Sequence, residues 1–160
     1  TGETERADAA YARHIQCSTR DPRLQEAAAA MVSDDVATAE RTFDDASTLH
    51  GLFPHMHFRG RSFSYEAVYP DATRELLLST PNYSFNWQRA YMLEEPRNLP
   101  AGTKIVCRAV FDNSAQNKFN PDPTQTVKWG DQSFDEMLIG YMGVTRARRA
   151  DAAVAVDASE

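Results

Sequence analysis

The sequence predicts an all-β fold, a sandwich of short antiparallel strands. Several short segments rich in aromatic and β-branched residues alternate between apolar and polar side chains, as half-buried strands do. Turn-forming residues separate these segments, and the strand–helix–strand rhythm of a parallel sheet does not occur. With 160 residues the chain suits one domain. We divide it into an N-terminal appendage (residues 1–33), the β-sandwich (34–146) and a flexible tail (147–160).

The two ends of the chain differ from its middle. The first part is rich in Ala, Arg and Glu, and Asp21 followed by Pro22 is typical of the start of a helix. We therefore expect a helical or partly disordered N-terminal appendage. The last residues are charged and rich in alanine with no core pattern, so we expect the tail to be frayed.

Strand-like segments follow one another from Val36 onward. The clearest is 61–69, where Phe63 and Tyr65 alternate with serines. Residues 105–111 are largely apolar on both faces, as expected in the middle of a sandwich. Further strands are predicted at 36–43, 48–60, 76–80, 84–93 and 135–145, and loops at 96–104 and 112–126.

Charge and hydropathy exclude some classes of function. The formal net charge of -6 argues against nucleic acid or an anionic membrane as partner. No run of about 18 apolar residues is present, so we do not expect the chain to span a membrane. The chain starts at Thr1 without a signal-peptide pattern, which suits either removal of a leader or a fragment of a longer protein.

The two cysteines, Cys17 and Cys107, form no C-x-x-C motif. This spacing excludes a zinc ribbon, a thioredoxin-type motif and a c-type haem attachment within the chain. The cysteines could pair in an oxidising compartment, but we favour two buried thiols.

The most informative motif is a His-x-His pair, His55 and His57. In an extended segment these side chains lie on one face, with Met56 on the other. Two neutral imidazoles held in this way form half of a metal site, whereas the structural alternative is a pair of surface histidines. His50 should lie on the opposite face of a straight strand and be structural or exposed, although a bulge at Gly51 would change its direction.

The motifs "FPHMHFRG", "AVFDNS", "NPDPT" and "WGDQSFDEM" carry a resemblance to a known family. From about Thr48 to Val144 the chain resembles the C-terminal, catalytic-copper domain of the type II copper, ascorbate-dependent monooxygenases, which include the peptidylglycine α-hydroxylating and dopamine β-monooxygenases. It is most similar to bacterial versions, which are often joined to c-type cytochrome or thioredoxin-like modules. The resemblance implies a jelly-roll-like antiparallel β-sandwich.

The resemblance also implies one copper ion per chain, bound by His55, His57 and Met137, the methionine of "DEM". Imidazole suits Cu(II) and a thioether suits Cu(I), so this donor set serves both oxidation states and leaves positions for dioxygen. Tyr141 lies four residues after Met137 and shares its face of the expected strand, so we predict a catalytic, substrate-side role for it. The structural alternatives are that Met137 and Tyr141 are core residues.

The implied activity is oxidation of a small-molecule substrate by dioxygen, with one oxygen atom inserted into a C–H bond. An external donor, such as a cytochrome c or another copper domain or subunit, would supply electrons, and we expect a periplasmic or extracellular protein. One alternative is a copper-binding or structural subunit of a larger redox or surface assembly, without catalysis of its own. Another is an adhesion or interaction module that binds no metal.

The chain also departs from the family pattern. Phe53 and Ile139 replace an arginine and an asparagine that anchor a peptide carboxylate in the eukaryotic hydroxylases, so we do not expect a C-terminal glycine peptide as substrate. A disulfide of the family is also absent, because its two positions hold Ala109 and Leu138. Only His14 and His50 remain for the family's second, three-histidine copper site, which is too few.

Overall fold

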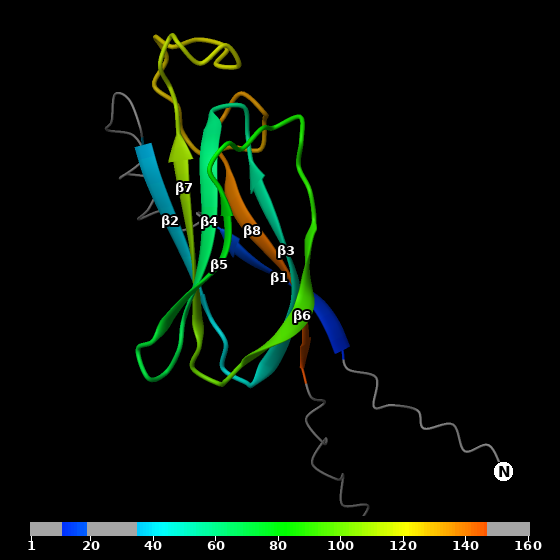
Figure 1. Ribbon diagram of the computed structural model, residues 1–160. Helices are drawn as coiled ribbons and strands as arrows, with labels where there is room; N and C mark the ends of the chain where they lie inside the picture. The colour runs from blue at the N-terminus through cyan, green and yellow to red at the C-terminus, as the bar shows by residue number, and fades with distance from the viewer. Residues whose placement is uncertain (1–10, 19–34, 147–160) are drawn as a thin grey trace, which may run out of the picture.

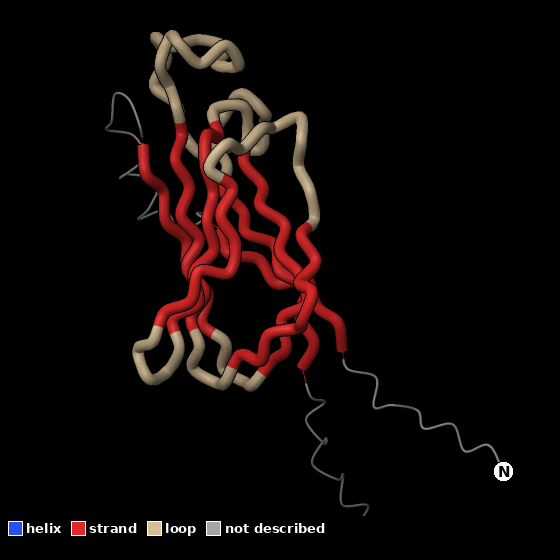
Figure 2. The backbone as a smooth tube through the Cα atoms, in the orientation of Figure 1, coloured by secondary structure: helices blue, strands red, loops and turns tan. Residues whose placement is uncertain are grey.

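The computed structural model describes residues 11–18 and 35–146, which form eight strands. No helix occurs in these two ranges, and therefore none that could cross a bilayer (Figure 2). The strands are β1 (Tyr11–Ser18), β2 (Asp35–Thr42), β3 (Ser47–Met56), β4 (Gly60–Val68), β5 (Arg74–Thr80), β6 (Tyr91–Leu99), β7 (Lys104–Phe111) and β8 (Leu138–Arg146).

The strands form two four-stranded antiparallel sheets, in the orders β1-β8-β3-β6 and β2-β7-β4-β5 (Figure 1). The chain crosses repeatedly from one sheet to the other, so that most neighbours within a sheet are distant in sequence. This strand order is that of an eight-stranded jelly roll. The predicted antiparallel, jelly-roll-like β-sandwich is confirmed.

The hydrophobic core lies between the two sheets. On β4 the side chains of Phe63, Tyr65 and Ala67 are buried, and those of Ser62, Ser64 and Glu66 are not, as the alternation predicted. Further core side chains come from β3 and β8 of the facing sheet: Leu49, Leu52, Met56, Leu138, Met142 and Val144.

Part of the predicted N-terminal appendage belongs to the sandwich. Residues 11–18 form β1, which pairs with β8 from Tyr11 opposite Arg146 to Ser18 opposite Ile139. This strand covers an edge of β8 that would otherwise leave backbone hydrogen-bonding groups unpaired. The helix start predicted at Asp21 and Pro22, and the predicted tail, lie outside the described residues.

The predicted strand at 84–93 is wrong for most of its length. Residues 81–90 form turns and irregular chain. Strand β6 begins only at Tyr91 and continues through Pro96, which belongs to the predicted loop at 96–104. A proline is tolerated here because β6 is an edge strand with β3 as its one neighbour in the sheet, so a missing N–H need not break a ladder bond.

A β-bulge in β3 changes the direction of His50. The register with both β6 and β8 shifts between Leu49 and Gly51, and Leu49 and Leu52 both point into the core. His50 therefore lies on the same outer face of the sheet as Phe53 and His55. In a straight strand it would lie on the face opposite to His55. Its Nε2 lies 2.9 Å from Oγ1 of Thr145, a structural contact.

Three connections gather at one end of the sandwich, the upper end in Figures 1 and 2. They are the β3–β4 turn, the β5–β6 segment at 81–90 and the long β7–β8 loop at 112–137. The predicted site residues lie at this end.

Candidate metal centre

His55 and His57 lie side by side where β3 ends. His55 is half-buried on the outer face of its sheet, and His57 follows the last residue of the strand and is 4% exposed. Their ring centroids are 5.3 Å apart and the ring planes are nearly perpendicular, at 89°. This proximity agrees with the predicted pairing of the two imidazoles.

Each imidazole uses its Nδ1 atom in a contact with an acceptor oxygen. Nδ1 of His55 lies 2.7 Å from Oε1 of Gln88, and Nδ1 of His57 lies 3.3 Å from the carbonyl oxygen of Asp135. The Gln88 amide is oriented by donation from its Nε2 to the carbonyl of Phe85, at 2.9 Å. With an oxygen acceptor at Nδ1, the neutral tautomer of each ring has its proton on Nδ1 and its lone pair on Nε2, the atom that would bind a metal.

The environment of His57 favours its neutral form. Burial, and next the neighbouring His55, lower the pKa of His57, and hydrogen bonding to the backbone of Asp135 opposes this only in part. The ring also packs edge-on against Phe85, with centroids 6.3 Å apart. A neutral imidazole is the form that binds metals.

Met137 lies directly before β8 and is 8% exposed. Met56 pairs with Leu138, so continuing this register by one residue puts Met137 opposite His57. In the part of the chain that the structure describes, no group of three or more His, Cys, Asp and Glu side chains could hold a metal ion. Within residues 11–18 and 35–146, the thioether of Met137 is therefore a candidate third donor of another kind.

Tyr141 stands over the same outer face. Its ring centroid is 5.9 Å from that of Phe53, its register partner on β3, and 6.4 Å from that of His55. Phe53, His55, Ala90 and Tyr141 line an open hollow of about 550 Å³. Of the two residues at the family's carboxylate-anchoring positions, Phe53 lines this hollow and Ile139 is the register partner of His55.

Two further residues that position the histidines were not found from the sequence. Gln88 and Tyr83 both lie in the irregular 81–90 segment, and Tyr83 hydrogen-bonds the backbone of Met56. No local sequence signal marks them, because their partners on β3 are about thirty residues away in the chain.

Arg59, also not singled out from the sequence, joins the loops at this end. It is 2% exposed, and its guanidinium donates to Oδ1 of Asn113 and Asn120, each at 2.9 Å, and to the carbonyl of Phe134. Burial lowers the pKa of Arg59, while nearby carboxylates, Glu136 first, oppose this shift. No local sequence signal marks this contact, because Asn113 and Asn120 follow Arg59 by 54 and 61 residues.

Residues 25–147 match the family described as copper type II ascorbate-dependent monooxygenase, C-terminal domain. The chain belongs to this family. A comparison with curated proteins finds no significant match. The family match includes β2 to β8 and excludes β1.

The copper monooxygenase family is copper-dependent and uses dioxygen, a substrate and an external reductant. The donors at this end of the sandwich fit copper. Two imidazoles whose Nδ1 atoms face oxygen acceptors suit Cu(II), and the thioether of Met137, opposite His57 in the continued register, suits Cu(I). The open hollow beside His55 leaves room for further ligands and a substrate.

Proposed function

We propose that this domain binds one copper ion through His55, His57 and Met137 and hydroxylates a C–H bond of a small molecule with dioxygen. The observation that supports this most strongly is the pair of Nδ1 contacts, which direct the lone pair of each neutral ring to Nε2, with His55 lining an open hollow. When bound, copper would supply the one-electron redox chemistry with dioxygen that no side chain here provides.

The protein itself orients the donors. Gln88 and the carbonyl of Asp135 fix the tautomer and the rotation of the two rings. Burial lowers the pKa of His57, so its imidazole stays neutral and able to bind metal. Orientation before binding reduces the entropy that metal binding costs.

The substrate in this proposal lies in the hollow against Phe53, Ala90 and Tyr141. The two aromatic rings pack against an apolar group, exclude water and place its C–H bond beside His55. Tyr141 is the substrate-side residue of the reaction. Among the residues that the structure describes, no Asp, Glu, Lys or Arg lines the hollow, so a carboxylate on the substrate would meet no charged partner from them, and neutral apolar compounds are favoured.

Electrons in this proposal come from outside the chain, which has four histidines in total. Besides the two proposed ligands there remain His14 and His50, and His50 contacts Thr145. Another copper domain or subunit, or a cytochrome c, is the proposed donor. We place the protein in the periplasm or outside the cell.

The test is isotope incorporation from ¹⁸O₂. The copper-loaded chain is supplied with ascorbate and a panel of neutral arylalkanes and matched carboxylates. We expect labelled alcohol from the neutral compounds, loss of product in His57→Ala, and product in His50→Ala. Copper binding without labelled product from any compound would contradict the enzymatic proposal and favour a copper-binding subunit.

A further inference from the structure

Cys107 of β7 reaches across the core to the backbone of the opposite sheet. Its side chain is fully buried, and its Sγ occupies the place where a Cβ on Gly140 of β8 would lie. Such a Cβ would also come within 2.8 Å of Cε1 of Tyr65. The absent side chain at Gly140 is therefore what allows the sulfur of Cys107 to approach β8.

The register of β1 brings the second cysteine to the same place. Cys17 is directly opposite Gly140, two residues along from Ile15, which is opposite the core residue Met142. Residues directly opposite in an antiparallel pair share a face of the sheet, with their Cβ positions about 5 Å apart. Position 17 thus lies on the face of the sheet where Gly140 meets the sulfur of Cys107, next to the position that this sulfur approaches.

We propose that Cys17 and Cys107 form an intramolecular disulfide that links β1 of one sheet to β7 of the other. Our sequence-based preference was for two buried thiols, and the placement of both residues at Gly140 changes it. The pairing is independent of the copper proposal. It is also not carried over from the family, because Cys17 precedes the matched segment 25–147.

The bond forms by thiol–disulfide exchange with a disulfide oxidant, either a small molecule or a protein. One cysteine thiolate attacks the oxidant and releases its first sulfur as a thiol, which gives a mixed disulfide. The other cysteine thiolate then displaces the second sulfur. Two cysteine thiols are oxidised to one disulfide, and one disulfide is reduced to two thiols that take up the two protons.

The disulfide would hold β1 against the start of β8, at the end of the sandwich where the candidate metal ligands lie. Gly140 lies between Ile139, the register partner of His55, and Tyr141, which stands over the hollow. It would also close a long loop of chain, which lowers the entropy of the unfolded state. We expect the midpoint of thermal unfolding to be higher by roughly 10 °C in the oxidised chain than in the reduced chain.

The direct test uses the full chain without copper, incubated with glutathione disulfide, then denatured with an alkylating reagent and weighed by mass spectrometry. We expect a monomer lighter than the reduced chain by two hydrogen atoms, with no alkylated cysteine and one cross-linked peptide pair containing Cys17 and Cys107. Alkylation of both cysteines, or a disulfide between two chains, would overturn the proposal.

Cys17→Ser provides the control, because it removes the bond and leaves the buried Cys107 in place. A thiol reductant should lower the unfolding midpoint of the wild-type chain and leave that of Cys17→Ser unchanged. Equal midpoints of the wild-type chain with and without reductant would count against the bond. Since this readout needs no metal, its failure is distinct from a failure of the copper proposal.

Discussion

The phenol of Tyr83 hydrogen-bonds both backbone polar groups of Met56, the residue between His55 and His57. Its oxygen accepts from the N–H of Met56 at 2.9 Å and donates to the carbonyl of Met56 at 2.8 Å. β6 pairs with β3 only as far as Leu52, so at this end of β3 one side chain takes the place of a neighbouring strand. The spacing of the two histidines therefore depends on a residue of the β5–β6 segment.

Tyr83→Phe should lower both the stability of the protein and its affinity for copper. The N–H and carbonyl of Met56 each lose a partner, which we expect to reduce the free energy of unfolding by about 2 kcal/mol. Urea unfolding and a Cu(I) competition titration measure the two effects. Tyr69→Phe is the matched control, because it removes a 2.5 Å bond to Glu75 in the other sheet. A Tyr83→Phe protein with wild-type copper affinity would refute the positioning role.

Gln88→Leu should weaken copper binding with little change in the fold. Without Oε1, the Nδ1 proton of His55 has lost its acceptor, and loss of such an outer partner typically costs about 10- to 100-fold in metal affinity. Gln88→Glu keeps an acceptor and should restore most of the affinity. If both variants bind Cu(I) equally, the hydrogen bond to His55 has no role in orienting the ligand.

Arg59→Met should destabilise the domain by about 3 kcal/mol, because the substitution leaves buried acceptors and carboxylates without their cation. Arg61→Met, two residues away and exposed, should change the unfolding free energy by less than about 1 kcal/mol. Chemical unfolding of both variants tests this difference. Equal losses would mean that Arg59 does not hold the loops together.

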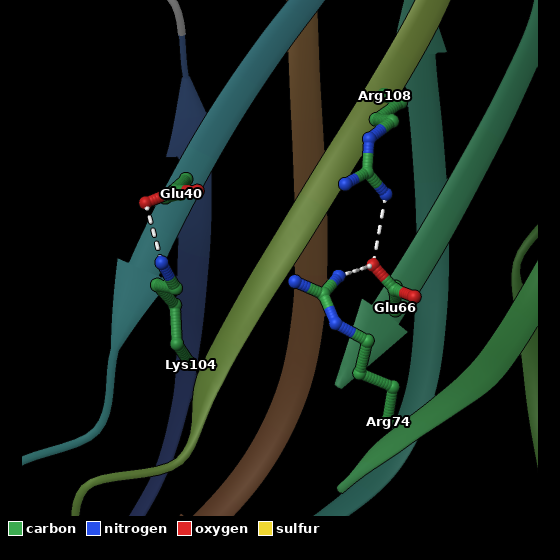
Figure 3. Close-up of polar contacts among 5 residues, drawn as sticks. All are labelled: Glu40, Glu66, Arg74, Lys104 and Arg108. Carbon is green, nitrogen blue, oxygen red and sulfur yellow. Dashed lines mark hydrogen bonds and ion pairs between the residues drawn. The ribbon is translucent and has the colours of Figure 1, made fainter. Parts of the chain in front are cut away.

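Glu66 bridges two arginines on the outer face of the second sheet (Figure 3). Its carboxylate accepts from Arg74 at 2.8 Å and from Arg108 at 2.9 Å, and the pKa of Glu66 is lowered, first by the hydrogen bond from Arg108. A pKa lowered in the folded state stabilises the protein above the ordinary value of 4.5, and this stabilisation is lost as the pH falls through the folded-state pKa.

Glu66→Gln should therefore cost stability at neutral pH and little in acid. Because these are surface ion pairs, we expect a loss of about 1 kcal/mol or less at about pH 6, shrinking progressively below pH 4.5. Glu40→Gln is the control, since Glu40 pairs with Lys104 at 3.0 Å (Figure 3) and both side chains are well exposed. Urea unfolding across this pH range measures the effect. A loss of unfolding free energy in Glu66→Gln that did not change with pH would contradict this explanation.

Local patterns predicted much of this structure, and long-range contacts account for what they missed. The alternation of Phe63, Tyr65 and Ala67 is a local signal of a half-buried strand and was read correctly. The edge strands β1 and β6 were not predicted correctly. β1 is placed by its pairing with β8, and β6 contains a proline that only an edge position tolerates.

The candidate site divides in the same way. The sequence indicated His55, His57, Met137 and Tyr141. In the fold, the end of β3 pairs with the start of β8, which brings these residues to one end of the sandwich. It did not indicate Gln88, Tyr83 or Arg59, because a single glutamine, tyrosine or arginine has no pattern that reveals a partner tens of residues away.

The most direct test of the copper proposal is the number of copper ions bound per chain, with the Cu(I) affinity, in the wild-type chain, His57→Ala and His50→Ala. We predict one copper per wild-type chain, an affinity at least about 100-fold weaker in His57→Ala, and wild-type behaviour in His50→Ala, whose imidazole contacts Thr145. No tight copper in the wild-type chain, or equal losses in both variants, would contradict the proposed site.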